Sequence, residues 1–93
     1  MPKYLVIWEI NPSQRAANPT EFGKMMSGAG EFVQQNIDKG LIKSWGAYLT
    51  GNKGYGVWEC SPTDLYKEIQ KFAPYFTCEV NEVISLGELP QAQ

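Results

Sequence analysis

One stretch near the middle of the chain constrains the fold more than any other: residues 45–60 predict a β-hairpin. Two runs of aromatic and β-branched residues flank the turn sequence Gly51-Asn52-Lys53-Gly54. Glycine and asparagine tolerate the positive φ angles that a tight reversal requires, so the chain is expected to fold back on itself here. A strand-then-helix pattern precedes the hairpin and a helix-then-strand pattern follows it, and this symmetry indicates one particular fold.

The N-terminal segment predicts a strand followed by a loop. Residues 3–10 alternate in the manner of a strand, and both of its faces are largely apolar, which is typical of a strand that is covered on both sides. Residues 12–19 contain two prolines and mostly polar side chains, and they predict a polar loop. A strand that needs cover on both faces belongs near the centre of a sheet.

Apolar residues then recur at helical spacing, which predicts the first helix over residues 20–39. Thr20 is the expected N-cap, and Gly40 supplies a left-handed C-cap. Gly28 and Gly30 lower the helix propensity by about 1 kcal/mol each relative to alanine. We interpret these two glycines as allowing the helix to approach the sheet closely.

The second half of the chain repeats the pattern in mirror order. Strands are predicted at residues 41–50 and 55–60, on either side of the turn. Ser61-Pro62 then provides an N-cap and a proline at the first helical position, and Pro74 ends this second helix. Residues 77–86 predict the last strand.

The predicted order of elements is β-α-β-β-α-β, the ferredoxin-like pattern of the α+β class. Right-handed crossovers give an antiparallel four-stranded sheet in the order 4-1-3-2, with both helices on one face. Residues 1–87 are expected to form this single domain, and residues 88–93 a polar C-terminal tail.

The predicted sheet leaves one face without helices, although its two central strands are apolar on both faces. One face carries Tyr4, Val6, Trp8 and Trp58, and the other carries Leu5, Ile7 and Val57. An uncovered apolar face of this size is an interaction surface. We therefore expect a homodimer, with a higher oligomer left open, in which the free faces of two sheets pack together into an α+β barrel.

Composition and charge exclude several classes of function. The net charge is −2 and no two basic residues are adjacent, which argues against a nucleic-acid partner. No apolar stretch approaches the about 20 residues that span a bilayer, so no membrane partner is expected. The chain has no histidine, the commonest metal and haem ligand, and its two cysteines are expected to be free thiols of a cytoplasmic protein. We expect neither a metal nor a cofactor.

Several motifs carry a resemblance to a known group of proteins. They are Tyr55-Gly56-Val57-Trp58-Glu59-Cys60-Ser61-Pro62 and Phe72-Ala73-Pro74-Tyr75-Phe76, together with Lys39-Gly40, Trp45, Gly51 and Glu79-Val80. The chain resembles the muconolactone isomerase-like branch of the dimeric α+β barrel superfamily, in particular its small uncharacterised prokaryotic members. That resemblance implies a dimer with a small-molecule pocket between sheet and helices in each subunit. Members include isomerases, cofactor-free monooxygenases, haem enzymes and proteins with no known chemistry.

The chain departs from that branch around its second strand. The branch has basic and histidine residues there, where this chain has Ile42-Lys43-Ser44-Trp45. Muconolactone isomerisation itself is therefore not expected, and haem bound through a proximal histidine is excluded by composition.

Two strand carboxylates, Glu9 and Glu59, and one phenol, Tyr55, are the candidate catalytic groups. Pairing Ile7 with Val57 would place Glu9 opposite Tyr55, with Glu59 on the same face. A carboxylate within a buried strand tends to have a raised pKa and can act as a general base, while a tyrosine donates to a developing enolate. The alternative is that both carboxylates lie at strand ends, solvated or paired with a basic side chain.

Aromatic residues are the candidate ligand-binding groups. Those that can line a pocket for a flat molecule are Trp45, Tyr48, Trp58, Tyr66, Tyr75 and Phe76. The alternative is packing in the core and at the dimer interface. The pairing considered above would also place Trp8 across from the bare backbone of Gly56. Cys60 precedes a helix N-terminus, which lowers a thiol pKa, unless it is a buried structural thiol.

Three functions follow from these patterns. The first is a dimer that binds a small cyclic or aromatic molecule between sheet and helices. The second is a cofactor-free isomerase or monooxygenase that uses a strand carboxylate as general base. The third is a structural or regulatory module without catalysis. A cavity lined by Glu9, Tyr48, Tyr55 or Glu59 would favour the first two, and a fully packed interior would favour the third; whether the protein is an enzyme stays open.

Overall fold

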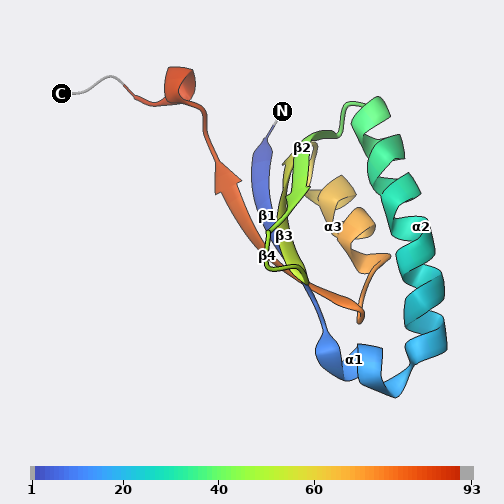
Figure 1. The fold of residues 1–93 in the computed structure, drawn as a ribbon. Coiled ribbons are helices and arrows are strands. Elements are labelled where there is room, and N and C mark those ends of the chain that lie inside the picture. Colours follow the sequence, from blue (N-terminus) through green and yellow to red (C-terminus); the bar gives the residue numbers. More distant parts are fainter. Residues whose placement is uncertain (1, 91–93) are drawn as a thin grey trace.

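Four antiparallel strands form the sheet of an α+β fold with a ferredoxin-like arrangement (Figure 1). The computed structural model describes residues 2–90. The strands are β1 Lys3–Ile10, β2 Ile42–Ala47, β3 Lys53–Glu59 and β4 Phe76–Val83, and they lie in the order β2-β3-β1-β4. This is the predicted order 4-1-3-2 counted from the other edge, so the predicted fold class is confirmed.

Helices cover one face of this sheet. Within the described residues the helical segments are α1 Pro12–Ala17, α2 Pro19–Asp38, α3 Pro62–Gln70 and the short 3-10 helix η1 Leu86–Glu88. Figure 1 shows α2 and α3 on the same side of the sheet, with α1 below it at the end of β1. The two long predicted helices are therefore present, and α1 is an addition to them.

The segment between β1 and α2 is not the predicted polar loop, because two Asn-Pro pairs each start a helix. Asn11 is the N-cap of α1, and its side chain accepts from the backbone N–H of Ser13 at 3.1 Å. Asn18 is both the C-cap of α1 and the N-cap of α2. The proline that follows each asparagine sits at the first helical position, where its missing N–H costs nothing. The predicted N-cap Thr20 is therefore one residue inside α2.

The hairpin predicted at residues 45–60 is present, with a longer turn than expected. The backbone N–H of Tyr48 donates to Lys53 O at 2.8 Å, and that of Gly51 donates to Tyr48 O at 2.8 Å. Gly51 and Asn52 take the positive φ angles of 78° and 62° that the reversal requires. Because the turn occupies residues 48–52, β2 ends three residues earlier than predicted and β3 begins two residues earlier.

A β-bulge in β2 decides which side chains of that strand face the helices. The pairing of β2 with β3 shifts between Ile42 and Ser44, so Lys43 is the extra residue. Regular alternation would turn Ile42 and Trp45 to opposite faces, since they are three residues apart. The bulge cancels one step of that alternation and brings both side chains to the helix side.

The core lies between the sheet and the two long helices. Its buried members are Tyr4, Val6, Ile42, Trp58, Cys60 and Leu65. The interpretation of Gly28 and Gly30 in α2 is wrong, because a Cβ at either position would meet nothing within 4 Å. Neither glycine is therefore needed for a close approach of α2 to the sheet.

The C-terminal segment runs away from the sheet as an extended arm (Figure 1). Ile84 and Leu86, beyond the end of β4, are 53% and 86% exposed. The turn η1 is held by a capping box in which the backbone N–H of Ser85 donates to Glu88 Oε1 at 2.9 Å, and Ser85 Oγ donates to the same oxygen at 2.6 Å. Hydrogen bonds from Ser85 lower the pKa of the Glu88 carboxyl. Residues 91–93 of the predicted tail lie outside the described residues.

None of the helices within residues 2–90 combines the length and the hydropathy of a membrane span. No three histidine, cysteine or acidic side chains in that range gather closely enough to hold a metal ion.

Candidate functional site

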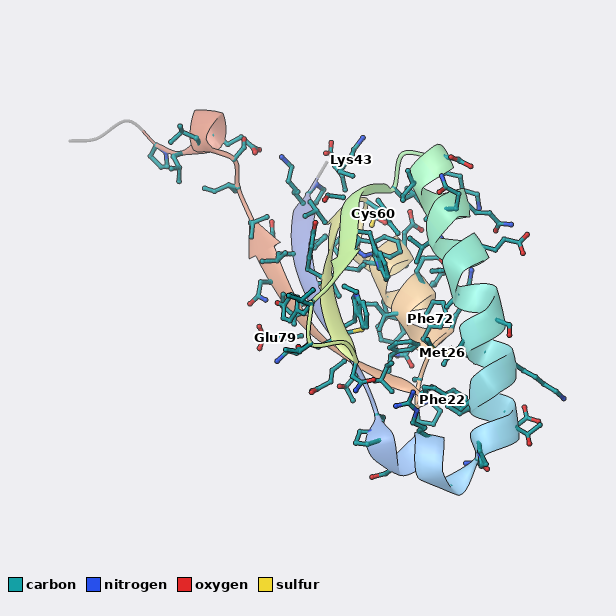
Figure 2. All side chains as sticks on the ribbon, viewed as in Figure 1. Phe22, Met26, Lys43, Cys60, Phe72 and Glu79 are labelled. Atoms are coloured by element: carbon teal, nitrogen blue, oxygen red, sulfur yellow. The ribbon has the colours of Figure 1, made fainter. Side chains whose placement is uncertain are left out.

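A groove runs between the helix-bearing face of the sheet and the helices α2 and α3. It has a large chamber of about 460 Å³, between α2 and the sheet, and a small chamber of about 80 Å³ that also touches α3. The residues that line both chambers are Trp8, Ala29, Val33, Trp45 and Phe76, so the chambers adjoin. Figure 2 shows Met26 and Phe72 in the space between the sheet and α2. Ligand pockets of proteins typically measure about 300–1,000 Å³, and the large chamber falls within that range.

Aromatic rings make an unbroken series along this groove. Trp45 stacks on Trp8 with ring centroids 5.3 Å apart and planes 10° from parallel. The edge-to-face contacts then run from Trp8 to Phe76 at 5.8 Å and from Phe76 to Phe72 at 5.7 Å. Phe72 contacts Phe32 of α2 at 4.6 Å. The series therefore crosses from the edge strand β2 to the helix α2 and offers both ring faces and ring edges to a flat molecule.

Two glycines of β3 make room for the indoles on the helix side of the sheet. Trp8 pairs with Gly54, and a Cβ at Gly54 would lie 2.6 Å from Trp8 Cε2 and still closer to Cζ2. A Cβ at Gly56 would lie 3.1 Å from Trp58 Nε1 and 3.4 Å from Trp45 Cδ1. The absence of side chains at these two positions of β3 therefore leaves the space that the three indoles occupy.

The groove lining is almost wholly apolar, and its carboxylate and amide side chains each make a hydrogen bond on α2 or beside α3. The Glu68 carboxylate accepts from Lys71 Nζ at 3.0 and 3.2 Å. Gln34, on the large chamber, donates to Asp38 Oδ1 at 3.0 Å. Burial raises the pKa of the Cys78 thiol, which keeps it protonated near neutral pH. The Trp8 indole nitrogen is buried and has no hydrogen-bond partner within residues 2–90.

Of the predicted ligand-binding residues, Trp45, Trp58 and Phe76 line the groove. Tyr48 lies in the hairpin turn and is 40% exposed, and Tyr66 is 66% exposed on α3. Tyr75 packs against Phe22 instead, with ring centroids 6.1 Å apart. These three tyrosines are therefore not part of either chamber's lining.

The predicted catalytic groups Glu9, Glu59 and Tyr55 lie on the opposite face of the sheet from the groove. The pairing that would have joined them is wrong by two residues, since Leu5 and not Ile7 pairs with Val57. Glu9 pairs with Lys53 at one end of the β1–β3 ladder, and Glu59 pairs with Lys3 at the other.

The corrected pairing separates the two carboxylates by six residue steps, about 20 Å along the strands. Tyr55 OH is 3.2 Å from the Ser44 hydroxyl. The strand-end alternative therefore describes both carboxylates, and the groove has no carboxylate from either strand in its lining.

The two cysteines are free thiols, as predicted. Cys60 is fully buried in the core, and desolvation, followed by the nearby carboxylates of Asp64 and Glu68, raises its pKa. The helix N-terminus beside it does not produce a reactive thiolate, so the buried structural alternative holds for Cys60.

Several groove residues were not identified as such from the sequence. Trp8 was expected across from Gly56, whereas it pairs with Gly54, and Phe32 and Phe72 were expected only as apolar residues of the two predicted helices. One available signal is the Gly54-x-Gly56-x-Trp58 pattern in β3, because alternate glycines on one face of a strand leave space for large side chains from its neighbours.

Comparisons with known proteins add no assignment. No family model and no curated protein sequence matches this chain. The fold and the groove therefore define a ferredoxin-like α+β domain with an aromatic groove between sheet and helices, and the function rests on that geometry.

Proposed function

We propose that the protein binds a small, flat, cyclic or aromatic molecule in the groove between the sheet and the helices. The observation that carries this proposal is the unbroken series of aromatic rings from Trp45 to Phe32. A flat ligand gains apolar burial together with stacking or edge contacts along such a series. The volume of the large chamber suits a ligand of one to three fused rings.

The three tryptophans of the chain all line the small chamber, so they report directly on binding. We expect naphthalene, a flat apolar probe, to shift the indole N–H signals of the ¹⁵N-labelled protein in a saturable manner. Ala29, which lines both chambers, offers the blocking variant: Ala29→Phe fills the groove and abolishes the shifts. Ser27→Phe, on an exposed position of the same helix, is the matched control and leaves them intact. Unchanged indole signals in the wild-type protein would refute the proposal.

We also propose that the helix-free face of the sheet binds a second copy of the chain. The half-buried apolar side chains on this face are Leu5, Ile7, Tyr55, Val57 and Val83. Charged residues flank them in a regular pattern. At one end of the β1–β3 ladder Lys3 lies opposite Glu59, and at the other Glu9 lies opposite Lys53.

This charge pattern is complementary to itself. If a two-fold axis runs parallel to the strands through the centre of the β1–β3 pair, Lys3 of one copy lies over Glu59 of the other. If the axis runs across the strands, Lys3 lies over Glu9 of the other copy. Opposite charges meet in both arrangements, and this complementarity favours a second copy as the occupant of the face. Light scattering at micromolar concentration tests it: we expect the mass of a dimer, and a monomer would refute it.

The resemblance to the muconolactone isomerase-like branch is retained as a proposal, and it is supported by the ferredoxin-like fold, which is the fold that the resemblance implies. A cytoplasmic location is proposed with it, on the two free thiols. The cofactor-free isomerase or monooxygenase and the module without catalysis remain the alternative functions. Neither is favoured by an observation as specific as the aromatic series.

A further inference from the structure

Exposed apolar side chains gather on the C-terminal arm, which comprises residues 84–90. Ile84, Leu86 and Leu89 are all exposed there, and Leu86 is 86% exposed. Leu86 begins the 3-10 turn η1 and Leu89 is its C-cap, so the two leucines are three residues apart. Because a 3-10 turn repeats every three residues, both side chains lie on the same side of the arm. We call this pair of leucines the leucine ridge.

The conformation of the arm is fixed by its own residues. The backbone N–H and the hydroxyl of Ser85 both donate to the Glu88 carboxylate, at 2.9 and 2.6 Å. The backbone N–H of Glu88 donates to Ser85 O at 3.0 Å, and that of Leu89 donates to Leu86 O at 3.3 Å. These bonds order the turn while its leucines stay exposed. Less ordering is then needed when a partner binds, and such preorganisation favours association.

The arm continues the helix-free face beyond the end of the sheet. It follows directly on Val83, the last residue of β4, which lies opposite Lys3 and belongs to the apolar side chains of that face. Figure 1 shows the arm on the side of the sheet that faces away from α2 and α3. A second copy on the helix-free face lies on this same side, so the leucine ridge is placed to contact that copy.

The size of the sheet face indicates that a second contact is needed. Four strands about 4.8 Å apart, paired over about 20 Å of their length, present a face of roughly 400 Å². A stable interface of standard size buries about 800 Å² on each partner. The sheet face alone therefore supplies about half of the usual area. The arm is exposed apolar surface directly beside it, where it can add to that area.

We infer that the arm of each copy packs against the second copy and buries its leucine ridge there. This inference rests on the proposed dimer and adds a contact outside the sheets to it. A two-fold axis makes the contact reciprocal, so each dimer contains two such arms and one substitution in the chain changes both of them. The occupant is a second copy because the arm lies on the side where the self-complementary face places that copy.

Leu86→Ser and Leu49→Ser form a matched pair of variants. Leu49, in the hairpin turn, is fully exposed like Leu86, but it lies beyond the other end of the β1–β3 ladder, near Glu9 and Lys53. Since both leucines are exposed in the single chain, neither substitution is expected to unfold it. Sedimentation equilibrium should show the dimer weakened about tenfold or more in Leu86→Ser, because each dimer loses two apolar contacts. Leu49→Ser should stay within about twofold of wild type.

A second readout needs no substitution. In a sample of equal amounts of ¹³C-labelled and unlabelled wild-type chains, an isotope-filtered nuclear Overhauser experiment detects only contacts between copies. We expect such contacts from the methyl groups of Leu86 and Leu89. If the wild type is a dimer, but Leu86→Ser associates as tightly as Leu49→Ser and these contacts are absent, the inference is overturned while the proposed dimer stands. If the wild type is a monomer at micromolar concentration, both are overturned.

Discussion

Trp8 lies directly opposite Gly54 in the β1–β3 ladder, and its indole occupies the space that a side chain at position 54 would need. The contact links the register of the two central strands to the aromatic groove. The indole can lie over β3 because position 54 has no side chain, and there it stacks on the indole of Trp45 from the edge strand, with ring centroids 5.3 Å apart.

Gly54→Ala tests this relationship. The added methyl group would collide with the Trp8 ring and with the carbonyl oxygen of Gly46, so something in the sheet has to shift. We expect the free energy of unfolding to fall by about 1–3 kcal/mol, as for other overpacked sites, in urea denaturation. Gly28→Ala is the control: it meets nothing within 4 Å and should raise stability by up to about 1 kcal/mol. Equal effects of the two substitutions would contradict this account.

Deleting Lys43 tests the role of the bulge. Without the extra residue, regular alternation turns Trp45 to the helix-free face, and its stack on Trp8 is lost. We expect the far-ultraviolet circular dichroism couplet of the stacked indoles to disappear, with a stability loss of about 1–3 kcal/mol. Lys43→Ala keeps the bulge and should keep the couplet. A couplet that survives the deletion would show that the bulge does not direct Trp45.

The buried thiols predict a loss of stability at alkaline pH. Burial raises the pKa of Cys60 and Cys78 in the folded protein above the value near 8.5 of an exposed thiol. The protonated thiols therefore contribute stability that is complete below about pH 8.5 and is lost as the pH rises through the folded values. We expect the slope of unfolding free energy between pH 8.5 and 10 to be shallower in the Cys60→Ala/Cys78→Ala variant than in the wild type. Identical slopes would show that the thiols do not contribute.

Exchanging one charge pair on the helix-free face distinguishes the two possible dimer axes. In the Lys3→Glu/Glu59→Lys variant, opposite charges still meet if the axis runs parallel to the strands, and the dimer constant is unchanged. If the axis runs across the strands, four attractive contacts become repulsive, and the dimer weakens about tenfold or more. Sedimentation equilibrium measures the constant at low salt, and the difference should shrink at high salt. Lys24→Glu, on α2, is the control and should have no effect on association.

The strand carboxylates Glu9 and Glu59 are expected to have no effect on ligand binding. Glu9→Gln and Glu59→Gln change groups that lie on the opposite face from the groove, at positions opposite Lys53 and Lys3 in the β1–β3 ladder. Each should leave the naphthalene dissociation constant within about twofold of wild type, since surface substitutions away from a site have small effects. A tenfold change in either variant would place that carboxylate at the ligand.

The order of the elements was predictable because local signals mark it. The hairpin glycines, the Ser61-Pro62 helix start and the glycine after α2 each act within a few residues of their own position. The helix α1 was equally accessible, since Asn11-Pro12 has the same cap-and-proline form as Ser61-Pro62. It was missed because its six residues carry no apolar stripe.

The site was less predictable, because it depends on pairing between distant strands. A two-residue error in the register of β1 and β3 keeps every side chain on its correct face, which is why the fold survived it. The same error brings Glu9 opposite Tyr55, whereas Glu9 pairs with Lys53 and Tyr55 with Ile7. The bulge at Lys43 has no local signal in the sequence at all, yet it decides on which side Trp45 lies.

The helix α2 is anchored near its start and again in its second half. Near its start Phe22 packs on Tyr75, and in its second half Phe32 packs on Phe72 with ring centroids 4.6 Å apart. The stretch between these supports contains Gly23, Gly28 and Gly30, none of which is needed for a close contact. Each removes about 1 kcal/mol of helix propensity relative to alanine. The part of α2 above the groove therefore has low intrinsic helix stability, and we expect it to adjust to ligands of different thickness more readily than the backbone of β3 does.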